Sequence, residues 1–182
     1  QRQFGGSFTA LLDAAESSVE NFVARLWQDL PKFRDAHDYT LQNGETVEIP
    51  VLKRAQHLAA SLCVALPRCG HSAPFHDADK ITSFPDNKIS HVMMVEGILI
   101  PSNKLKMKIE TGERFAIGAP EELENRILGR HIIRLMARQT GMTQVALDYQ
   151  IWEHSHANAV VHPDIKYRDI PHLMTEEPSF NY

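Results

Sequence analysis

The sequence predicts a mainly α-helical, single-domain protein. Apolar residues recur at three- and four-residue spacing through most of the 182 residues, whereas strand-like alternation is confined to one short stretch. The length suits about one domain, and a hydrophobic share of 43% with 23% charged residues is ordinary for a packed chain. We therefore expect residues 1–182 to form one helical domain, in which about 158–182, with three prolines, run as an extended C-terminal arm.

The N-terminal half is predicted to hold two helices and one very short strand. One long amphipathic helix is expected over 7–30, because its apolar positions form a single stripe and a proline follows it. Alternation over 46–49 predicts the strand. Pro50 can open a second helix, since proline suits a first helical turn, and Pro67 should stop it. Residues 67–79 are expected to form a loop.

In the C-terminal half, capping residues mark three further helices after a short apolar segment over 89–100. A helix over 102–112 should begin with its serine as the cap and end at its glycine. A helix over 120–141 begins with a proline and two glutamates, which suit the positive end of the helix dipole, and ends at a glycine. The last helix should run over 143–152, capped by its threonine.

Composition narrows the function classes. Lys and Arg total 19 against 23 Asp and Glu, so the net charge of −4 provides no broad positive field for direct nucleic-acid binding. Every apolar run is broken by charge, so no membrane span is expected. Two free cysteines, Cys63 and Cys69, fit a reducing compartment, and we expect an intracellular protein, cytoplasmic or mitochondrial. The ten histidines do not match zinc-ligand spacing, so no metal or other cofactor is expected.

Two groups of residues in the middle of the chain could contact a nucleotide. Lys53 and Arg54 come at the start of a helix, where their side chains could meet a phosphate group, or could simply form a solvated face. Asp86 lies between a proline and an asparagine, which is a pattern typical of a turn. Residue types alone leave both alternatives open.

The last predicted helix pairs aromatic rings with carboxylates. Asp148 and Trp152 are four residues apart, as are Tyr149 and Glu153, so each pair lies on one helix face. A carboxylate can accept two parallel hydrogen bonds from the edge of a guanine-like ring, and an aromatic side chain offers a face for stacking. A buried aromatic stripe with solvated acids is the alternative.

An ordered set of motifs resembles the queuosine salvage protein family. The motifs, in chain order, are Phe4-Gly5-Gly6-Ser7-Phe8, Phe33-Arg34-Asp35, Lys53-Arg54-Ala55-Gln56, Ile81-Thr82-x-Phe84-x-Asp86 and Leu147-Asp148-Tyr149-x-x-Trp152. The resemblance spans nearly the whole chain but only the C-terminal part of a family member. It implies a helical body similar to that of DNA glycosylases.

The resemblance also implies that the protein is a queuosine 5′-phosphate N-glycosidase. Such an enzyme hydrolyses the bond between ribose and the 7-deazaguanine base queuine, so that the base can be reused for tRNA modification. Asp86 matches the family's catalytic carboxylate. The substrate-binding residues are expected to be Phe84, Pro85, Asp148, Tyr149 and Glu153. Lys53, Arg54 and Lys88 are expected to support them. The ligand would be a small-molecule nucleotide or its base.

The chain departs from the family pattern directly after Asp86 and at its C-terminal end. Residues 87–91 are Asn-Lys-Ile-Ser-His where the family has Tyr-Arg-x-Pro-Gln, and the His-Arg-rich C-terminal end is replaced by His172-Leu173-Met174. In the family, an N-terminal part supplies a histidine to the pocket, so a partner chain or N-terminal segment is expected to complete the site here. The alternative function is a catalytically reduced homologue, serving as a structural subunit or ligand-binding component of a larger assembly.

Overall fold

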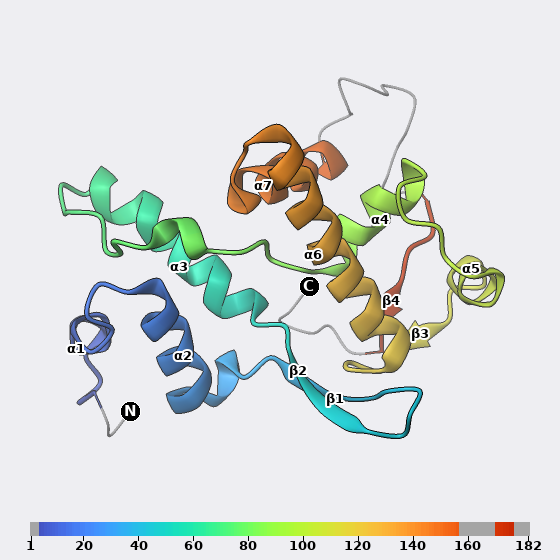
Figure 1. The fold of residues 1–182 in the computed structure, drawn as a ribbon, viewed down its shortest axis with the longest axis horizontal. Coiled ribbons are helices and arrows are strands. Elements are labelled where there is room, and N and C mark those ends of the chain that lie inside the picture. Colours follow the sequence, from blue (N-terminus) through green and yellow to red (C-terminus); the bar gives the residue numbers. More distant parts are fainter. Residues whose placement is uncertain (1–3, 157–169, 177–182) are drawn as a thin grey trace.

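A computed structural model describes residues 4–156 and 170–176, and this part of the chain is mainly helical (Figure 1). The elements, in chain order, are α1 Phe8–Asp13, α2 Val19–Asp29, β1 Ala36–Thr40, β2 Thr46–Pro50, α3 Lys53–Arg68, α4 Asn87–Val95, α5 Asn103–Glu110, β3 Arg114–Phe115, α6 Pro120–Thr140, α7 Gln144–His156 and β4 Met174–Thr175, with 3₁₀ turns at Pro31–Phe33 and Ala78–Lys80. The predicted fold class is therefore confirmed, whereas the likeness to DNA glycosylases stays a prediction.

The single helix predicted over 7–30 is wrong, because the structure contains two helices there. Glu16 and Ser17 adopt left-handed backbone conformations, with φ of 52° and 57°, which no continuous α-helix tolerates. The distant Asp77 fixes the restart: its carboxylate accepts hydrogen bonds from the Ser18 hydroxyl at 2.9 Å and from the Val19 N–H at 2.6 Å. A long-range contact therefore overrides the continuous apolar stripe.

The strand predicted over 46–49 is confirmed as β2, and its antiparallel partner β1 was not predicted. The second predicted helix is shifted, because α3 begins at Lys53 and runs through Pro67 to Arg68. Its start is displaced because the Val51 and Leu52 N–H groups both donate to the carbonyl of Asp35, at 2.8 and 3.1 Å. Leu52 is left-handed, with φ of 59°, and turns the chain from β2 into α3.

The C-terminal helices follow their predicted caps closely. The Ser102 hydroxyl accepts from the Leu105 N–H at 3.2 Å to begin α5, and the Thr143 hydroxyl accepts from the Ala146 N–H at 3.1 Å near the start of α7. Gly141 ends α6 with φ of 73°, which a side chain would strain. The apolar segment over 89–100 begins as helix α4, and α7 extends four residues beyond the predicted end.

Helix α6 lies at the centre of the molecule, with α1, α2 and α3 on one side and α4 and α5 on the other (Figure 1). Helices α4 and α6 approach closely at Ser90 and Gly129, where an added Cβ would meet the Ser90 hydroxyl at 2.5 Å. The segment 170–176 packs beyond α4 and forms the short parallel pair of β4 with β3. Most of the predicted C-terminal arm lies outside the described residues.

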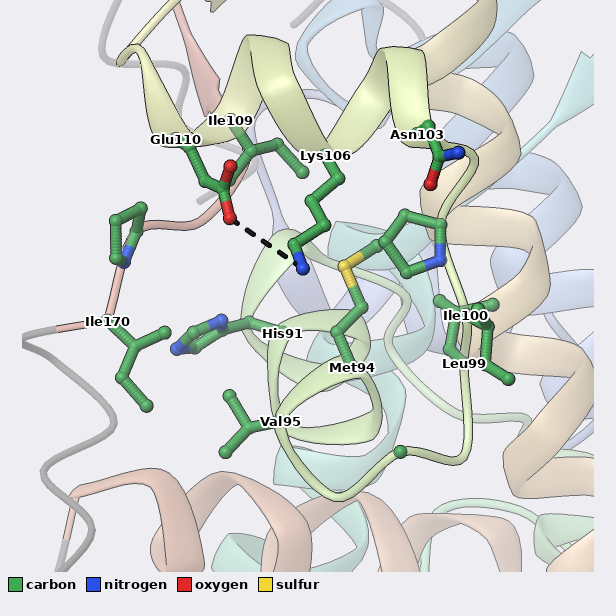
Figure 2. A pocket seen from close by; sticks show the side chains of 13 residues that line it. His91, Met94, Val95, Leu99, Ile100, Asn103, Lys106, Ile109, Glu110 and Ile170 are labelled. Atoms are coloured by element: carbon green, nitrogen blue, oxygen red, sulfur yellow. Dashed lines mark ion pairs between the residues drawn. The ribbon is translucent and has the colours of Figure 1, made fainter.

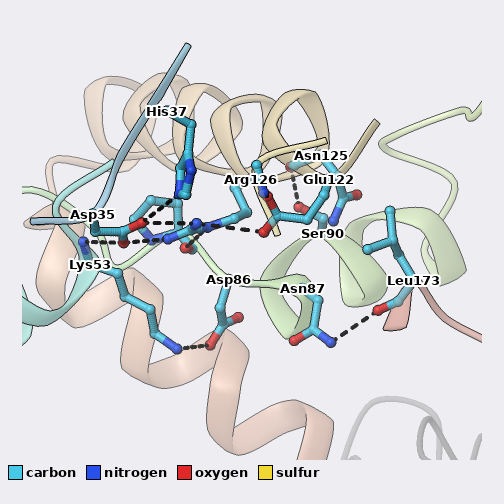
Figure 3. A network of polar contacts seen from close by, with 12 residues as sticks. Asp35, His37, Lys53, Asp86, Asn87, Ser90, Glu122, Asn125, Arg126 and Leu173 are labelled. Carbon is cyan, nitrogen blue, oxygen red and sulfur yellow. Dashed lines mark hydrogen bonds and ion pairs between the residues drawn. The ribbon is translucent and has the colours of Figure 1, made fainter. Parts of the chain in front are cut away.

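A buried arginine joins three separate parts of this fold (Figure 3). Arg126 of α6 is 0% exposed, and its guanidinium forms two hydrogen bonds to the carboxylate of Asp35. Its Nε donates to the carbonyl of Pro85 at 3.1 Å, and Glu122 one turn earlier on α6 completes the charge balance at 3.5 Å. Burial opposes ionisation of Asp35, but hydrogen bonds from His37 and Arg126 outweigh it and lower its pKa to about 2.

We predict that Arg126→Met destabilises the fold by about 3–5 kcal/mol, because the substitution removes the guanidinium that pairs with the buried Asp35 carboxylate. Unfolding in urea at pH 7 measures the difference. Arg134→Met is the matched control, since Arg134 is exposed on the same helix and should change stability by less than about 0.5 kcal/mol. Equal destabilisation by the two variants would contradict the central role of Arg126.

Candidate active site

Six of the nine predicted site residues, from three parts of the chain, meet at one pocket of about 430 Å³. Helix α3, the loop before α4 and helix α7 supply its walls. The lining residues are Lys53, Arg54, His57, Phe84, Asp86, Asp148, Tyr149 and Trp152. The pocket therefore combines two carboxylates, two basic side chains and a set of aromatic rings.

Asp86 occupies a fixed position in this pocket because both of its carboxylate oxygens are bound. Asp86 is the N-cap of α4, and its Oδ1 accepts from the Ile89 N–H at 3.1 Å. Its Oδ2 forms an ion pair with Lys53 Nζ at 3.0 Å (Figure 3). The backbone N–H of Lys53 in turn donates to Asp35 at 3.3 Å, so the Arg126–Asp35 pair also anchors the backbone of Lys53. Asp86 is 6% exposed.

Asp148 is in a different electrostatic environment. Its side chain is buried, and its Oδ2 accepts a hydrogen bond from the Phe84 N–H at 2.7 Å. Burial raises the pKa of Asp148 to about 7; the Phe84 hydrogen bond opposes this rise, the charge of Asp86 adds to it, and Lys53 opposes it. Asp148 therefore changes its ionisation state near neutral pH. Asp86, in contrast, forms an ion pair with Lys53.

Aromatic rings form the wall between α3 and α7. Phe84 and Tyr149 meet edge to face with 5.6 Å between ring centroids. His57 packs on both, at 5.0 Å from Phe84 and 6.2 Å from Tyr149. Trp152 adds a large ring that is 43% exposed. Such a wall offers flat surfaces on which a base can stack.

His57 also lines the pocket, although it is not among the site residues predicted from the sequence. Although His57 is exposed overall, partial burial of its ring lowers its pKa, the nearby Lys53 lowers it further, and Asp86 opposes both. The signal that could have found it is its spacing: His57 follows Lys53 by four residues, so both lie on one face of α3.

Three of the predicted site residues do not line this pocket. Pro85 is fully buried, and its carbonyl accepts from Arg126. Glu153 lines a neighbouring hollow of about 680 Å³ that shares Tyr149 with the pocket. Lys88 lies on α4, and its charge acts on His172 of the C-terminal segment. Pro85 is thus buried next to Asp86 and does not face the pocket. The substrate-binding or supporting roles predicted for Pro85, Glu153 and Lys88 stay predictions.

A second hollow, of about 380 Å³, lies between α4, α5 and the segment at Ile170 (Figure 2). Its walls are mainly apolar, from Met94, Val95 and Leu99 among others, with His91 and the Lys106–Glu110 ion pair at 3.8 Å. None of the predicted site residues lines it. It lacks the pair of buried carboxylates beside aromatic rings, so the pocket at Asp86 is the candidate site.

Other kinds of site find no support in the described part of the chain. Among residues 4–156 and 170–176, no group of three or more His, Cys, Asp or Glu side chains is placed to hold a metal ion. No helix in the same ranges is both long and apolar enough to cross a membrane.

Comparisons with known proteins identify the family of this chain. A family model described as queuosine salvage protein matches residues 1–172. Relatives named queuosine 5′-phosphate N-glycosylase/hydrolase include one from Sphaerobacter thermophilus, 31% identical over 83% of this chain and 46% of its own length. Another, from Bos taurus, is 27% identical over 84% of this chain and 47% of its length, and one from Schizosaccharomyces pombe is 27% identical over 82% and 42%. The chain spans about half the length of these curated relatives. Because the family model covers most of the sequence, the chain belongs to the queuosine salvage protein family.

Proposed function

We propose that the protein is an N-glycosidase that hydrolyses queuosine 5′-phosphate. Water adds its oxygen to C1′ of the ribose as the bond from C1′ to the base nitrogen breaks, and the second proton of the water ends on the base. The products are queuine and ribose 5-phosphate. The observation that carries this proposal is the buried Asp86 carboxylate, fixed at 3.0 Å from Lys53 beside an aromatic pocket.

Asp86 would act on the sugar. Departure of the base leaves positive charge on C1′ and the ring oxygen, and a carboxylate held nearby stabilises that charge without having to reorganise. Contacts to Lys53 and to the Ile89 N–H already fix both oxygens of Asp86. The same carboxylate can orient the attacking water or form a glycosyl bond that water then hydrolyses.

The other half of the pocket would bind the base. A 7-deazapurine has no N7 lone pair that could be protonated to help the base leave. Departure of the base therefore depends on the contacts that the protein makes with the face and the edge of its ring. Phe84, Tyr149 and Trp152 supply stacking surfaces. Asp148, as a carboxylate, can accept from the ring N–H and the exocyclic amine of the base edge. The cationic arm of queuine would extend towards Glu153 in the neighbouring hollow.

The 5′-phosphate would lie at the first turn of α3. Lys53 and Arg54 line the pocket there, and the backbone N–H groups of a helix N-terminus favour an anion. Both side chains already make contacts within the protein, Lys53 with Asp86 and Arg54 with the Lys32 carbonyl. These contacts place the two cations on the same side of the pocket before a ligand arrives.

The segment that departs from the family pattern is built into the structure. Residues 87–91 form the first turns of α4, whose N-cap is Asp86 itself. The Asn87 amide is buried and donates to the carbonyl of Leu173 at 3.0 Å (Figure 3). Asp86 therefore still caps α4 and still pairs with Lys53 despite this departure, which favours the enzyme over the catalytically reduced homologue.

We predict that Asp86→Asn lowers turnover of queuosine 5′-phosphate by about 10²–10³-fold or more, because an amide cannot offset the positive charge at C1′. The fold should survive, since an asparagine side chain can still cap α4. Free queuine is measured by mass. The control is Asp38→Asn, the same substitution at an exposed position of β1, which should keep wild-type turnover.

Wild-type turnover that Asp86→Asn leaves unchanged would remove Asp86 from the reaction. A wild-type protein that binds queuine but never releases it from the nucleotide, even with any co-purifying partner, would instead support the ligand-binding alternative.

We also predict that queuine binds more tightly as the pH rises through 7. In the ligand-free protein, Asp148 is partly protonated near its pKa of about 7. The base can bind only to the ionised carboxylate of Asp148, so binding releases a proton. Affinity at pH 5.5 should be about tenfold or more below that at pH 8. Asp148→Asn should abolish this dependence and weaken binding at pH 8 by about 2–4 kcal/mol. Calorimetry in buffers of different ionisation enthalpy measures both effects.

Glu153→Gln serves as the control for this experiment and should weaken binding less while keeping the pH dependence. Thermal unfolding checks that Asp148→Asn is folded. The pKa of Asp148 is near 4 in the unfolded chain but about 7 in the folded protein, so wild type loses stability as the pH rises from about 4 to 7. The amide carries no such penalty, so the variant should melt no lower than wild type at pH 8. A pH-independent affinity in wild type would contradict base-edge binding by Asp148.

A further inference from the structure

His57 stands between the two halves of the pocket. It follows Lys53 by one turn of α3, and its ring packs on Phe84 at 5.0 Å and on Tyr149 at 6.2 Å. The ring thus joins the base-stacking wall while sharing the pocket with the Lys53–Asp86 ion pair. A nucleoside bound with its base on that wall and C1′ at Asp86 would lie against His57.

Partial burial and the nearby Lys53 charge together disfavour the protonated form of His57. On its own helix, Lys53 and Arg54 are cations; from the loop before α4, Asp86 faces it with a charge that Lys53 already balances; and α7 contributes Asp148. Partial burial of the ring and the charge of Lys53 lower the pKa of His57, and Asp86 opposes them. The net effect favours the uncharged imidazole.

We propose that His57 is a further functional residue of the pocket: it works as an uncharged aromatic wall, and its protonation stops turnover by placing a second cation beside Asp86. This inference rests on the proposed glycosidase function. His57 acts through Asp86 and is a positioning residue, and nothing in the reaction requires it to give or take a proton.

The physical reason is the charge of the transition state. Asp86 lowers the barrier only by offsetting positive charge that develops at C1′. One cation, Lys53, is already 3.0 Å from its carboxylate. An imidazolium lining the same pocket would weaken the field of Asp86 and repel the cationic sugar. A neutral ring at this position keeps both the stacking surface and the field.

The first test is the pH profile of kcat at saturating queuosine 5′-phosphate, where bound base keeps Asp148 ionised. In wild type, kcat should fall about tenfold per pH unit below the pKa of His57. In His57→Phe, which keeps a ring but cannot be protonated, this fall should move to lower pH, and kcat at neutral pH should stay within about a few-fold of wild type. His57→Lys, a permanent cation, should lower kcat about tenfold or more above the pKa of His57, where the wild-type ring is uncharged. His131→Phe, on the exposed face of α6, should keep the wild-type profile.

Identical acid limbs in wild type and His57→Phe would overturn the proposal. A second measurement separates it from the proposed function: NMR titration of the His57 ring carbon needs no turnover. Lys53→Met should raise the pKa of His57, and Asp86→Asn should lower it. A His57 pKa that ignores both substitutions would reject the charge coupling even in an active enzyme. If the coupling is present but wild type releases no queuine, the glycosidase function fails, and the role of His57 in turnover fails with it.

Discussion

The pocket depends on one buried guanidinium. Arg126 binds the carboxylate of Asp35 and the carbonyl of Pro85, the residue directly before Asp86. Asp35 also accepts a hydrogen bond from the backbone N–H of Lys53. Arg126 is therefore linked to Lys53 through Asp35 and to Asp86 through the neighbouring Pro85. A charge in the protein interior is stable only when it is paired and hydrogen-bonded, and here the pairing fixes where α3 and α4 begin.

This arrangement gives two carboxylates in one pocket different properties. Asp86 is paired with Lys53, whereas Asp148 receives one backbone hydrogen bond and has its pKa raised to about 7, mainly by burial. Neighbouring acids whose environments differ in this way are suited to different tasks. In the proposed reaction, Asp86 meets the sugar and Asp148 meets the base, while His57 keeps the wall between them uncharged.

Local signals in the sequence were sufficient for the C-terminal helices, whose caps at Ser102, Gly141 and Thr143 form as expected. Predictions failed where distant contacts decide. The break before α2 depends on Asp77, 58 residues beyond Val19, and the start of α3 depends on Asp35. The site residues came from motifs and family resemblance, and the structure brings most of them together. His57 needed the fold, because only packing shows that its face of α3 meets Phe84.

The most direct measurement is the structure of the Asp86→Asn protein with queuosine 5′-phosphate bound. We expect C1′ of the ribose beside residue 86, the base against Phe84 and Tyr149 with its edge on Asp148, and the phosphate at the first turn of α3. A ligand seated in the hollow beside His91 (Figure 2), or with its base turned away from Asp148, would contradict the account.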